Sequence, residues 1–394
     1  YVKVIILSIF VFLNLLIIFH LISMTSRIFI ANKTLFFLLS LISMMFLVSI
    51  LREVVYEVNV LSSISKLLFL ISSFLIGMYY VLLGKRKVDF DNYIKVISWM
   101  IFLPVILNFL FYVFGITSNN QSNLSATMLG LFGINVSRVE FLLAYGINSY
   151  GPIAAVSAIS SFFLRQASTS RSNKLIYNII FIISIISLLL IDSRGSLLLC
   201  LIILLTVNQL SKNKNLLYWA ILISPIAFII IPIIDLNFLD ILRRNDSDFT
   251  TLNNRTLFWA SVISYLYDFQ TSHLFGHRLF FQPDSFIIYS IFNNLNTSSV
   301  YFSFHNSLLQ LLIQIGYFGA FIFLITIRHL SGVLSKQTIN NSGNPLFKLT
   351  VSILLFILLI GNLETVFSPF SPFFFFIVLF IFNFLHPVYY SNED

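Results

Sequence analysis

The chain has 394 residues, of which 58% are hydrophobic and only 10% are charged, and its mean hydropathy is +0.95. Soluble domains carry about 25% charged residues, so this composition excludes a soluble globular protein. The net charge of +8 would indicate nucleic-acid binding in a soluble chain. In a membrane protein it reflects loop topology, and we predict no nucleic-acid partner. The one cysteine, Cys200, lies in an apolar run, which excludes an internal disulfide and a cysteine metal site.

Long apolar runs predict the membrane spans, because a helix needs about 20 apolar residues to cross the hydrocarbon core. We therefore predict an all-α, polytopic transmembrane helical bundle with about 11–12 spans. The first run lacks a small-residue cleavage site and is expected to be a span rather than a removable signal. The predicted spans are 4–22, 35–51, 67–84, 94–114, 139–164, 175–191, 196–210, 216–234, 306–327, 347–361 and 371–387.

Basic residues fall on alternate loops, and the positive-inside rule assigns those loops to the cytoplasm. The N-terminus is then outside and the C-terminus inside. An odd number of spans is less common, so a missed or broken N-terminal helix stays open as an alternative. The residues that set this orientation are Arg27, Lys33, Lys85, Arg86, Lys87, Lys95, Arg165, Arg171, Lys174, Lys212, Lys214, Arg328, Lys336 and Lys348.

One long segment with soluble character faces the outside in this topology, and a loop of that length is usually functional. The predicted domains are N-terminal membrane helices over 1–234, a large outer loop with short helices over 235–305, and C-terminal membrane helices over 306–394. Part of the loop is predicted to be helical from Arg255 to Tyr267, with Asn254 as N-cap. The loop carries four arginines on the side where basic residues are disfavoured: Arg243, Arg244, Arg255 and Arg278.

The motif Asp192–Ser196 lies between two apolar runs at the predicted outer face. Gly195 permits a tight turn, and the Arg194 guanidinium can hold a phosphate in a bidentate fork. The alternative is an interfacial arginine that is anchored at the headgroups or paired with Asp192. Arg255, near a helix start, can also face an anion, although alone it is better explained as a solvated loop arginine.

A second polar motif, His305-Asn306-Ser307, precedes an apolar run at the same face. Anions collect at helix N-termini, and an imidazole can act as a general base near neutral pH. Asn306, Gln310 and Gln314 recur at i, i+4 and i+8 and form a polar stripe, which in a membrane must face protein or water. The alternative is that Asn306 caps the helix and His305 is an ordinary loop residue.

Other polar patterns in the sequence are less specific for a functional site. Asp246-Ser247-Asp248 has the form of a metal-binding Asp-x-Asp but is better explained as an acidic turn. His273 and His277 lack a third zinc ligand, so we expect no metal site. Glu364 is a possible additional acid or base, and 368–372 is expected to form a short re-entrant turn. Gly316 and Gly319 are expected to serve close helix packing.

Three landmarks in this order resemble the O-antigen polymerase and ligase superfamily of bacterial envelope enzymes. They are Ser193-Arg194-Gly195 opening an apolar helix, Arg255 with Trp259 in a large outer loop, and His305 to Leu309 followed by Gln314 to Gly319. The resemblance covers about residues 175–330. One departure is Gly276-His277-Arg278, where the family usually has Gly-x-Gly.

The resemblance implies a GT-C-like architecture and an enzyme of the bacterial inner membrane whose active site faces the periplasm. Its donor and acceptor would both be undecaprenyl-pyrophosphate-linked glycans. The reaction would need no cofactor, nucleotide sugar or metal. A chain-length regulator is a possible partner protein. Arg194 and Arg255 would bind the pyrophosphate and His305 would deprotonate the attacking hydroxyl, with inversion at the sugar carbon. The residues expected to assist substrate binding are Arg278, Asn306, Gln310 and Asp192.

Three functions stay open at this point. A polymerase joins a growing lipid-linked glycan to the next lipid-linked repeat unit, and we favour it because the rest of the chain has no feature that we associate with ligases. A ligase moves the finished glycan to a lipid A core. A polyprenyl-glycan flippase predicts midplane binding residues and repeat symmetry, whereas this chain has its candidate residues on one face.

Overall fold

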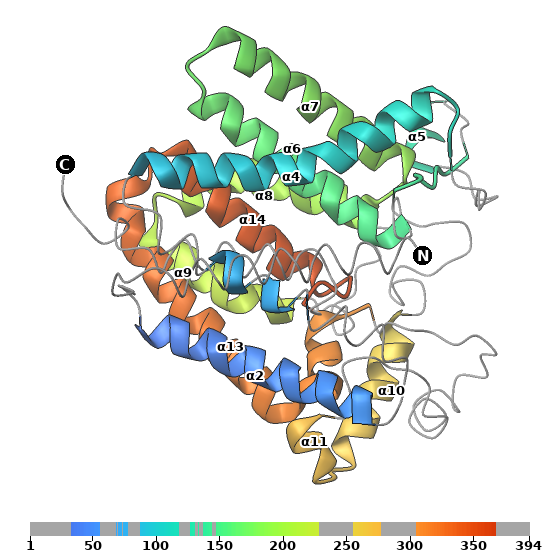
Figure 1. Ribbon diagram of the computed structural model, residues 1–394, viewed down its shortest axis with the longest axis vertical. Coiled ribbons are helices and arrows are strands. Elements are labelled where there is room, and N and C mark those ends of the chain that lie inside the picture. The colour runs from blue at the N-terminus through green and yellow to red at the C-terminus, as the bar shows by residue number, and fades with distance from the viewer. Residues whose placement is uncertain are drawn as a thin grey trace. The chain divides into compact units, whose positions relative to one another are not determined.

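The computed structural model describes residues 33–55, parts of 68–77, 87–117, parts of 127–143, 147–227, 255–276 and 305–367. Within these ranges the fold is all-α without a β-strand, as predicted (Figure 1). The helices are α2 (Lys33–Val55), α4 (Lys87–Val113), α5 (Thr127–Gly130), α6 (Ile147–Ala167), α7 (Arg171–Leu190), α8 (Arg194–Leu210), α9 (Lys214–Ile223), α10 (Arg255–Tyr267), α11 (Ser272–Phe275), α13 (Ser307–Asn341) and α14 (Pro345–Ile360).

Most of the predicted spans that fall on described residues correspond to helices. Three described helical segments are long and apolar enough to cross a membrane, namely Asn92–Val113, Arg171–Leu190 and Ser307–Thr338. Shorter apolar helices cover Phe36–Val48, Arg194–Leu210 and Pro345–Ile360. These helices make the chain a membrane protein. The predicted spans 4–22 and 371–387 lie outside the described residues.

The predicted span 139–164 is wrong at its beginning, because α6 starts only at Ile147. Two of the residues before α6 donate their backbone N–H groups to other helices. Val139 N donates to Leu190 O over 3.0 Å, and Leu143 N donates to the buried Asn108 Oδ1 over 2.8 Å. An apolar run thus contains a non-helical segment whose polar backbone is satisfied by α7 and α4.

The chain forms two compact units. The first comprises residues 1–90, 251–333 and 365–394, and the second comprises residues 91–250 and 334–364. The described helices of the first unit are α2, α10, α11 and most of α13, and those of the second are α4 to α9 and α14. The predicted domain boundaries at 234/235 and 305/306 stay predictions.

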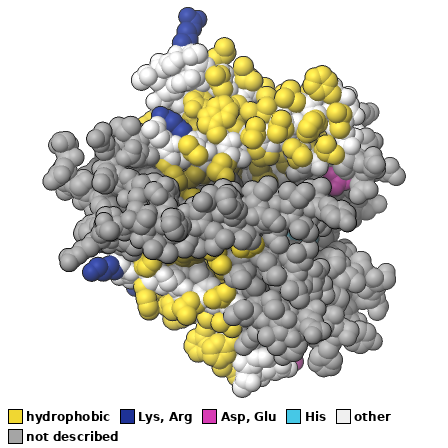
Figure 2. Space-filling view, in the orientation of Figure 1, with side chains coloured by type: hydrophobic (Ala, Val, Ile, Leu, Met, Phe, Trp, Pro, Cys, Tyr) yellow, Lys and Arg dark blue, Asp and Glu magenta, His cyan; other side chains and the backbone are white. Residues whose placement is uncertain are grey.

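Helix α7 in the second unit shows why this sequence suits a membrane. It packs against α6, and α14 packs against both α6 and α8. The buried face of α7 includes serines, and Ser184 Oγ lies 2.8 Å from Ser157 Oγ of α6. Its exposed face carries Leu175, Ile179, Ile182 and Ile186 at helical spacing. Small polar residues inside and apolar residues outside are typical of helices packed in lipid. Figure 2 shows that hydrophobic side chains cover much of the described surface in this view.

Most of the described lysines and arginines that flank helix connections in the second unit lie at one end of its helices. Arg165 and Arg171 flank the connection from α6 to α7, and Lys212 and Lys214 flank the connection from α8 to α9. Lys348 Nζ donates to Asn208 Oδ1 over 2.9 Å near that same end of α8 and α14. The turn between α7 and α8 lies at the opposite end of these helices. This charge separation is the pattern on which the predicted topology rests.

Helix α13 in the first unit is broken, whereas the sequence predicted one continuous span. Gly316 has φ 71° and ψ −174°, which divides the helix after Ile315. Gly276, just after α11, also has a left-handed φ of 76°. The two backbones lie in contact, because a Cβ on Gly276 would lie 2.5 Å from Gln314 C and 2.6 Å from Gly316 N. Both positions therefore require glycine, and the end of α11 occupies the break in α13.

Gly316→Ala should lower the stability of the first unit, because φ 71° with ψ −174° is a backbone conformation that is essentially restricted to glycine and costs other residues about 1–3 kcal/mol. The added Cβ would also meet the Leu274 backbone. Gly332→Ala is the matched control on the same helix, since its Cβ meets no atom within 4 Å. Alanine is the better helix former by about 0.8–1.0 kcal/mol, so this control should be neutral or stabilising. Thermal unfolding of the full chain in detergent measures both. Equal unfolding temperatures for the two variants would contradict the assigned break.

Candidate functional site

The turn between α7 and α8 holds Arg194 at the start of α8. Asp192 N donates to Leu189 O over 3.2 Å, and Ser193 N donates to Leu188 O over 3.2 Å, which ends α7. Asp192 has a φ of 52°. Because the turn is so short, α8 begins at once and its positive dipole end lies at Arg194.

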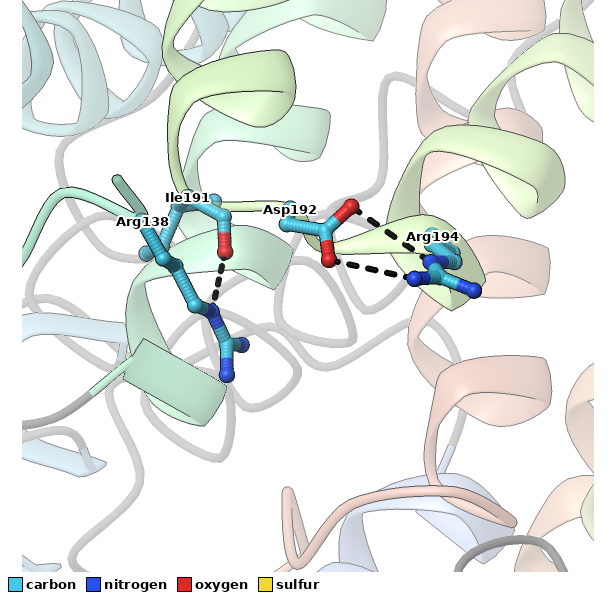
Figure 3. A network of polar contacts seen from close by, with 4 residues as sticks. All are labelled: Arg138, Ile191, Asp192 and Arg194. Carbon is cyan, nitrogen blue, oxygen red and sulfur yellow. Dashed lines mark hydrogen bonds and ion pairs between the residues drawn. The ribbon is translucent and has the colours of Figure 1, made fainter. Parts of the chain in front are cut away.

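Arg194 and Asp192 form an ion pair within this turn. Arg194 Nε lies 3.4 Å from Asp192 Oδ1, and Arg194 Nη2 lies 3.4 Å from Oδ2 (Figure 3). The carboxylate is fully buried, whereas 16% of the arginine side chain is exposed. The third guanidinium nitrogen points away from the carboxylate in Figure 3. An ion pair with Asp192 was the alternative explanation for Arg194 in the sequence analysis, and this ion pair is present. Its contacts are long, so it orients the guanidinium and leaves part of it accessible.

Two neighbouring elements hold the turn from its sides. Gly151 of α6 lies so close that a Cβ there would be 2.5 Å from the Ser193 Cβ. A Cβ on Gly195 would be 3.1 Å from Leu363 Cδ1, in the segment that follows α14. This segment is itself anchored, because Asn362 Nδ2 donates to Ser224 O over 2.7 Å. Gly151 could not be singled out from its sequence context, because a glycine in an apolar run can have many roles.

His305 occupies a similar turn before α13 in the first unit. Its φ is 49°, and the side chain is half-buried. Asn306 follows it and caps the helix, since its Oδ1 accepts from Leu308 N over 3.0 Å and from Leu309 N over 3.1 Å. Ser307 Oγ accepts from Val366 N over 2.8 Å. This capping role of Asn306 was the alternative to a functional one in the sequence analysis. The cap also holds the backbone of the neighbouring His305.

The predicted polar stripe on α13 is buried. Asn306, Gln310 and Gln314 are almost fully enclosed, and all three precede the break at Gly316. In a membrane, amide side chains at such positions face protein or water rather than lipid. The stripe therefore runs down the first short part of α13, starting directly below His305.

The structure describes only some of the other residues that were predicted to belong to the site. Arg255 opens α10, whose Trp259 is buried in the first unit. The structure pairs Arg194 with Asp192 in the second unit, and His305, Asn306 and Gln310 follow one another at the start of α13 in the first unit. Glu364 belongs to the turn that follows α14. Several predictions fall outside the described residues, namely those for Arg278, His277, 246–248 and 368–372.

His273 in α11 has a packing role. Its Nδ1 accepts from Gln270 N over 3.3 Å, and its ring lies 4.8 Å from the Tyr265 ring, between centroids. Burial lowers the pKa of His273, which favours the neutral imidazole. Tyr317 Oη, next to the α13 break, donates to Leu266 O over 2.8 Å. The contacts of His273 and Tyr317 attach α10 and α11 to α13, and no group of three potential metal ligands occurs in the described part of the chain.

A comparison with known families supports the resemblance carried by these motifs. Residues 179–324 match the sequence model of a family described as O-antigen ligase. The match begins in α7, ends in α13, and contains Arg194, Arg255 and His305. No curated protein and no solved structure matches the chain. The match covers less than half of the chain, and over these residues the chain is similar to that family.

Proposed function

We propose that the protein is an inner-membrane O-antigen polymerase that works at the periplasmic face. It transfers a growing glycan from undecaprenyl pyrophosphate to the next lipid-linked repeat unit. The observation that carries this proposal is the backbone at two turns. Among the described residues, Asp192 and His305 are the two non-glycine residues with positive φ. Each lies directly before a helix, and such backbone conformations cluster at functional sites.

The cationic part of the proposed site is Arg194. Its guanidinium is held by the buried Asp192 carboxylate at 3.4 Å and lies at the positive end of α8. A planar guanidinium suits bidentate recognition of phosphate oxygens. In this role Arg194 binds the donor pyrophosphate and stabilises the negative charge that grows on the leaving group. Asp192 contributes through the orientation of Arg194.

The base of the proposed site is His305. Its imidazole takes the proton from the acceptor sugar hydroxyl while the hydroxyl oxygen bonds to the anomeric carbon of the donor. The bond from that carbon to the phosphate oxygen breaks, and undecaprenyl pyrophosphate leaves with the electron pair. One displacement inverts the configuration at the carbon. The proton on His305 then passes to water.

Arg255 and Arg278 are proposed as further cations for the pyrophosphate, contributed by the long outer loop. Asn306 serves this site through its cap, which holds the turn of His305. Gln310 lies one helical turn below Asn306 and is proposed to contact the sugar of the acceptor. The chemistry needs neither a nucleotide sugar nor a metal ion, because the pyrophosphate is already the leaving group.

The second candidate function is an O-antigen ligase, and the description of the matching family favours it. Both functions use the same donor and the same three landmarks. They differ in the acceptor, which is a lipid-linked repeat unit for the polymerase and a lipid A core for the ligase.

Surface polysaccharide from a strain that lacks the native gene separates these two functions. A polymerase is expected to leave one repeat unit on the core when Arg194 or His305 is replaced by Ala, with loss of the longer ladder. Loss of all repeat units from the core would instead identify a ligase. A normal ladder from both variants would contradict the proposed site. The wild-type gene, returned on the same plasmid, is the reference.

A further inference from the structure

Arg138 is a buried arginine that the sequence analysis did not single out. Only 9% of the residue is exposed. Its Nε donates to the carbonyl oxygen of Ile191 over 2.6 Å, and the next residue, Val139, donates its N–H to Leu190 O over 3.0 Å. The segment that precedes α6 thus contacts the end of α7 at the residues that lead into Asp192 (Figure 3).

The contact satisfies backbone groups that a helix end leaves open. The last carbonyl groups of an α-helix have no partner within the helix, and the helix dipole makes that end attractive to a cation. Leu190 O and Ile191 O lie at this end of α7 and accept from Val139 and Arg138. A guanidinium is well suited to this position because it stays charged when it is buried.

The Ile191 carbonyl also belongs to the peptide plane that leads into Asp192. Arg138 holds the oxygen of this plane, and Leu189 O accepts from the Asp192 N–H of the same plane over 3.2 Å. The plane that follows Asp192 is also held, because Ser193 N donates to Leu188 O over 3.2 Å. With the planes on both sides fixed, the φ of 52° at Asp192 has little freedom. That φ directs the Asp192 carboxylate towards the Arg194 guanidinium, and in Figure 3 Asp192 lies between the two arginines.

We infer that Arg138 is a positioning residue for Arg194 and thereby for the lipid pyrophosphate. The inference rests on the proposed function, because Arg194 must bind that group. Arg138 acts through a sequence of contacts from the Ile191 carbonyl to the Asp192 carboxylate and then to the Arg194 guanidinium. In the predicted topology this arginine lies on the outer side, where the positive-inside rule disfavours a cation, and orienting Arg194 explains its presence.

A double-mutant cycle in binding affinity tests this inference. The full chain in nanodiscs is titrated with undecaprenyl pyrophosphate, using wild type, Arg138→Gln, Arg194→Gln and the double variant. Arg138→Gln should weaken the Kd by about tenfold when Arg194 is present, since a small misplacement of a binding group is costly. In the Arg194→Gln background the same change should alter the Kd by less than about twofold, because interacting residues are not additive.

Lys348→Met is the matched control, because it also removes a cationic hydrogen-bond donor from the second unit but at the Asn208 end of α8. It should leave the Kd unchanged. Arg138→Lys keeps a cationic donor and should recover part of the affinity, and it replaces Arg138→Gln in the cycle if that variant does not fold. Thermal unfolding of each variant reports the fold.

The outcomes separate the two claims. Non-additive losses support the positioning role. Equal losses in both backgrounds, or a wild-type Kd for folded Arg138→Gln, overturn it while leaving the proposed function intact, provided that Arg194→Gln binds weakly. A wild-type Kd for Arg194→Gln overturns the proposed pyrophosphate role of Arg194 and the inference that depends on it.

Discussion

His305→Asn is expected to reduce glycan polymerisation by about 10²–10⁴-fold, the range that a general base typically contributes. Asparagine is chosen because it tolerates a left-handed backbone, and His305 has a φ of 49°. The variant therefore removes the imidazole while keeping the turn before α13. The rate is measured from the length distribution of surface polysaccharide and, with purified enzyme, from the release of undecaprenyl pyrophosphate.

Two further variants separate the chemistry from the fold. His329→Asn changes another half-buried histidine, which lies within α13, and should retain wild-type activity. His305→Ala removes the base and also places a residue that disfavours positive φ, so it should be as inactive as His305→Asn and less stable. Wild-type polymerisation by His305→Asn would rule out this histidine as the base.

Arg194→Ala is expected to lower kcat/KM by about 10²–10³-fold, comparable to the loss of one donor that stabilises a developing anion. Arg194→Lys keeps the charge but loses the planar fork, so an intermediate loss is expected. The matched control is Arg171→Ala. Arg171 is also the first residue of a helix in the second unit, but it lies at the other end of the helices. It should retain activity.

The buried partner of Arg194 complicates the single variant. Removing the guanidinium leaves the Asp192 carboxylate buried without its ion-pair partner, which typically costs about 3–5 kcal/mol of stability. Arg194→Ala combined with Asp192→Asn removes this charge. The double variant should regain thermal stability without regaining activity. If it regained both, Arg194 would have a structural role only.

Hydrophobic patterning was enough to predict much of the helical architecture. Long apolar runs correspond to α4, α7 and α14 because lipid-facing residues must be apolar along their whole length. The spacing of Asn306, Gln310 and Gln314 predicted that they face protein or water rather than lipid, and all three are buried in the protein. Both predictions depend on local composition, which the sequence contains directly.

The features that hold the site depend on contacts between distant residues. The apolar run from 139 suggested a helix, yet Val139 and Leu143 bond to residues of α7 and α4. The importance of Arg138 lies in its bond to Ile191 O, 53 positions further along the chain. The break at Gly316 likewise follows from contact with Gly276. No local pattern reports such pairings, so they become visible only in the structure.

Turnover of a defined substrate by the purified chain tests the central claim most directly. The enzyme in nanodiscs is given one undecaprenyl-pyrophosphate-linked repeat unit, with EDTA and without nucleotide sugars or lipid A core. The proposed polymerase makes longer glycans and releases one undecaprenyl pyrophosphate for each new bond, and His305→Asn makes none. Unchanged repeat units in the wild-type reaction, the result expected of a ligase or a transporter, would contradict the account.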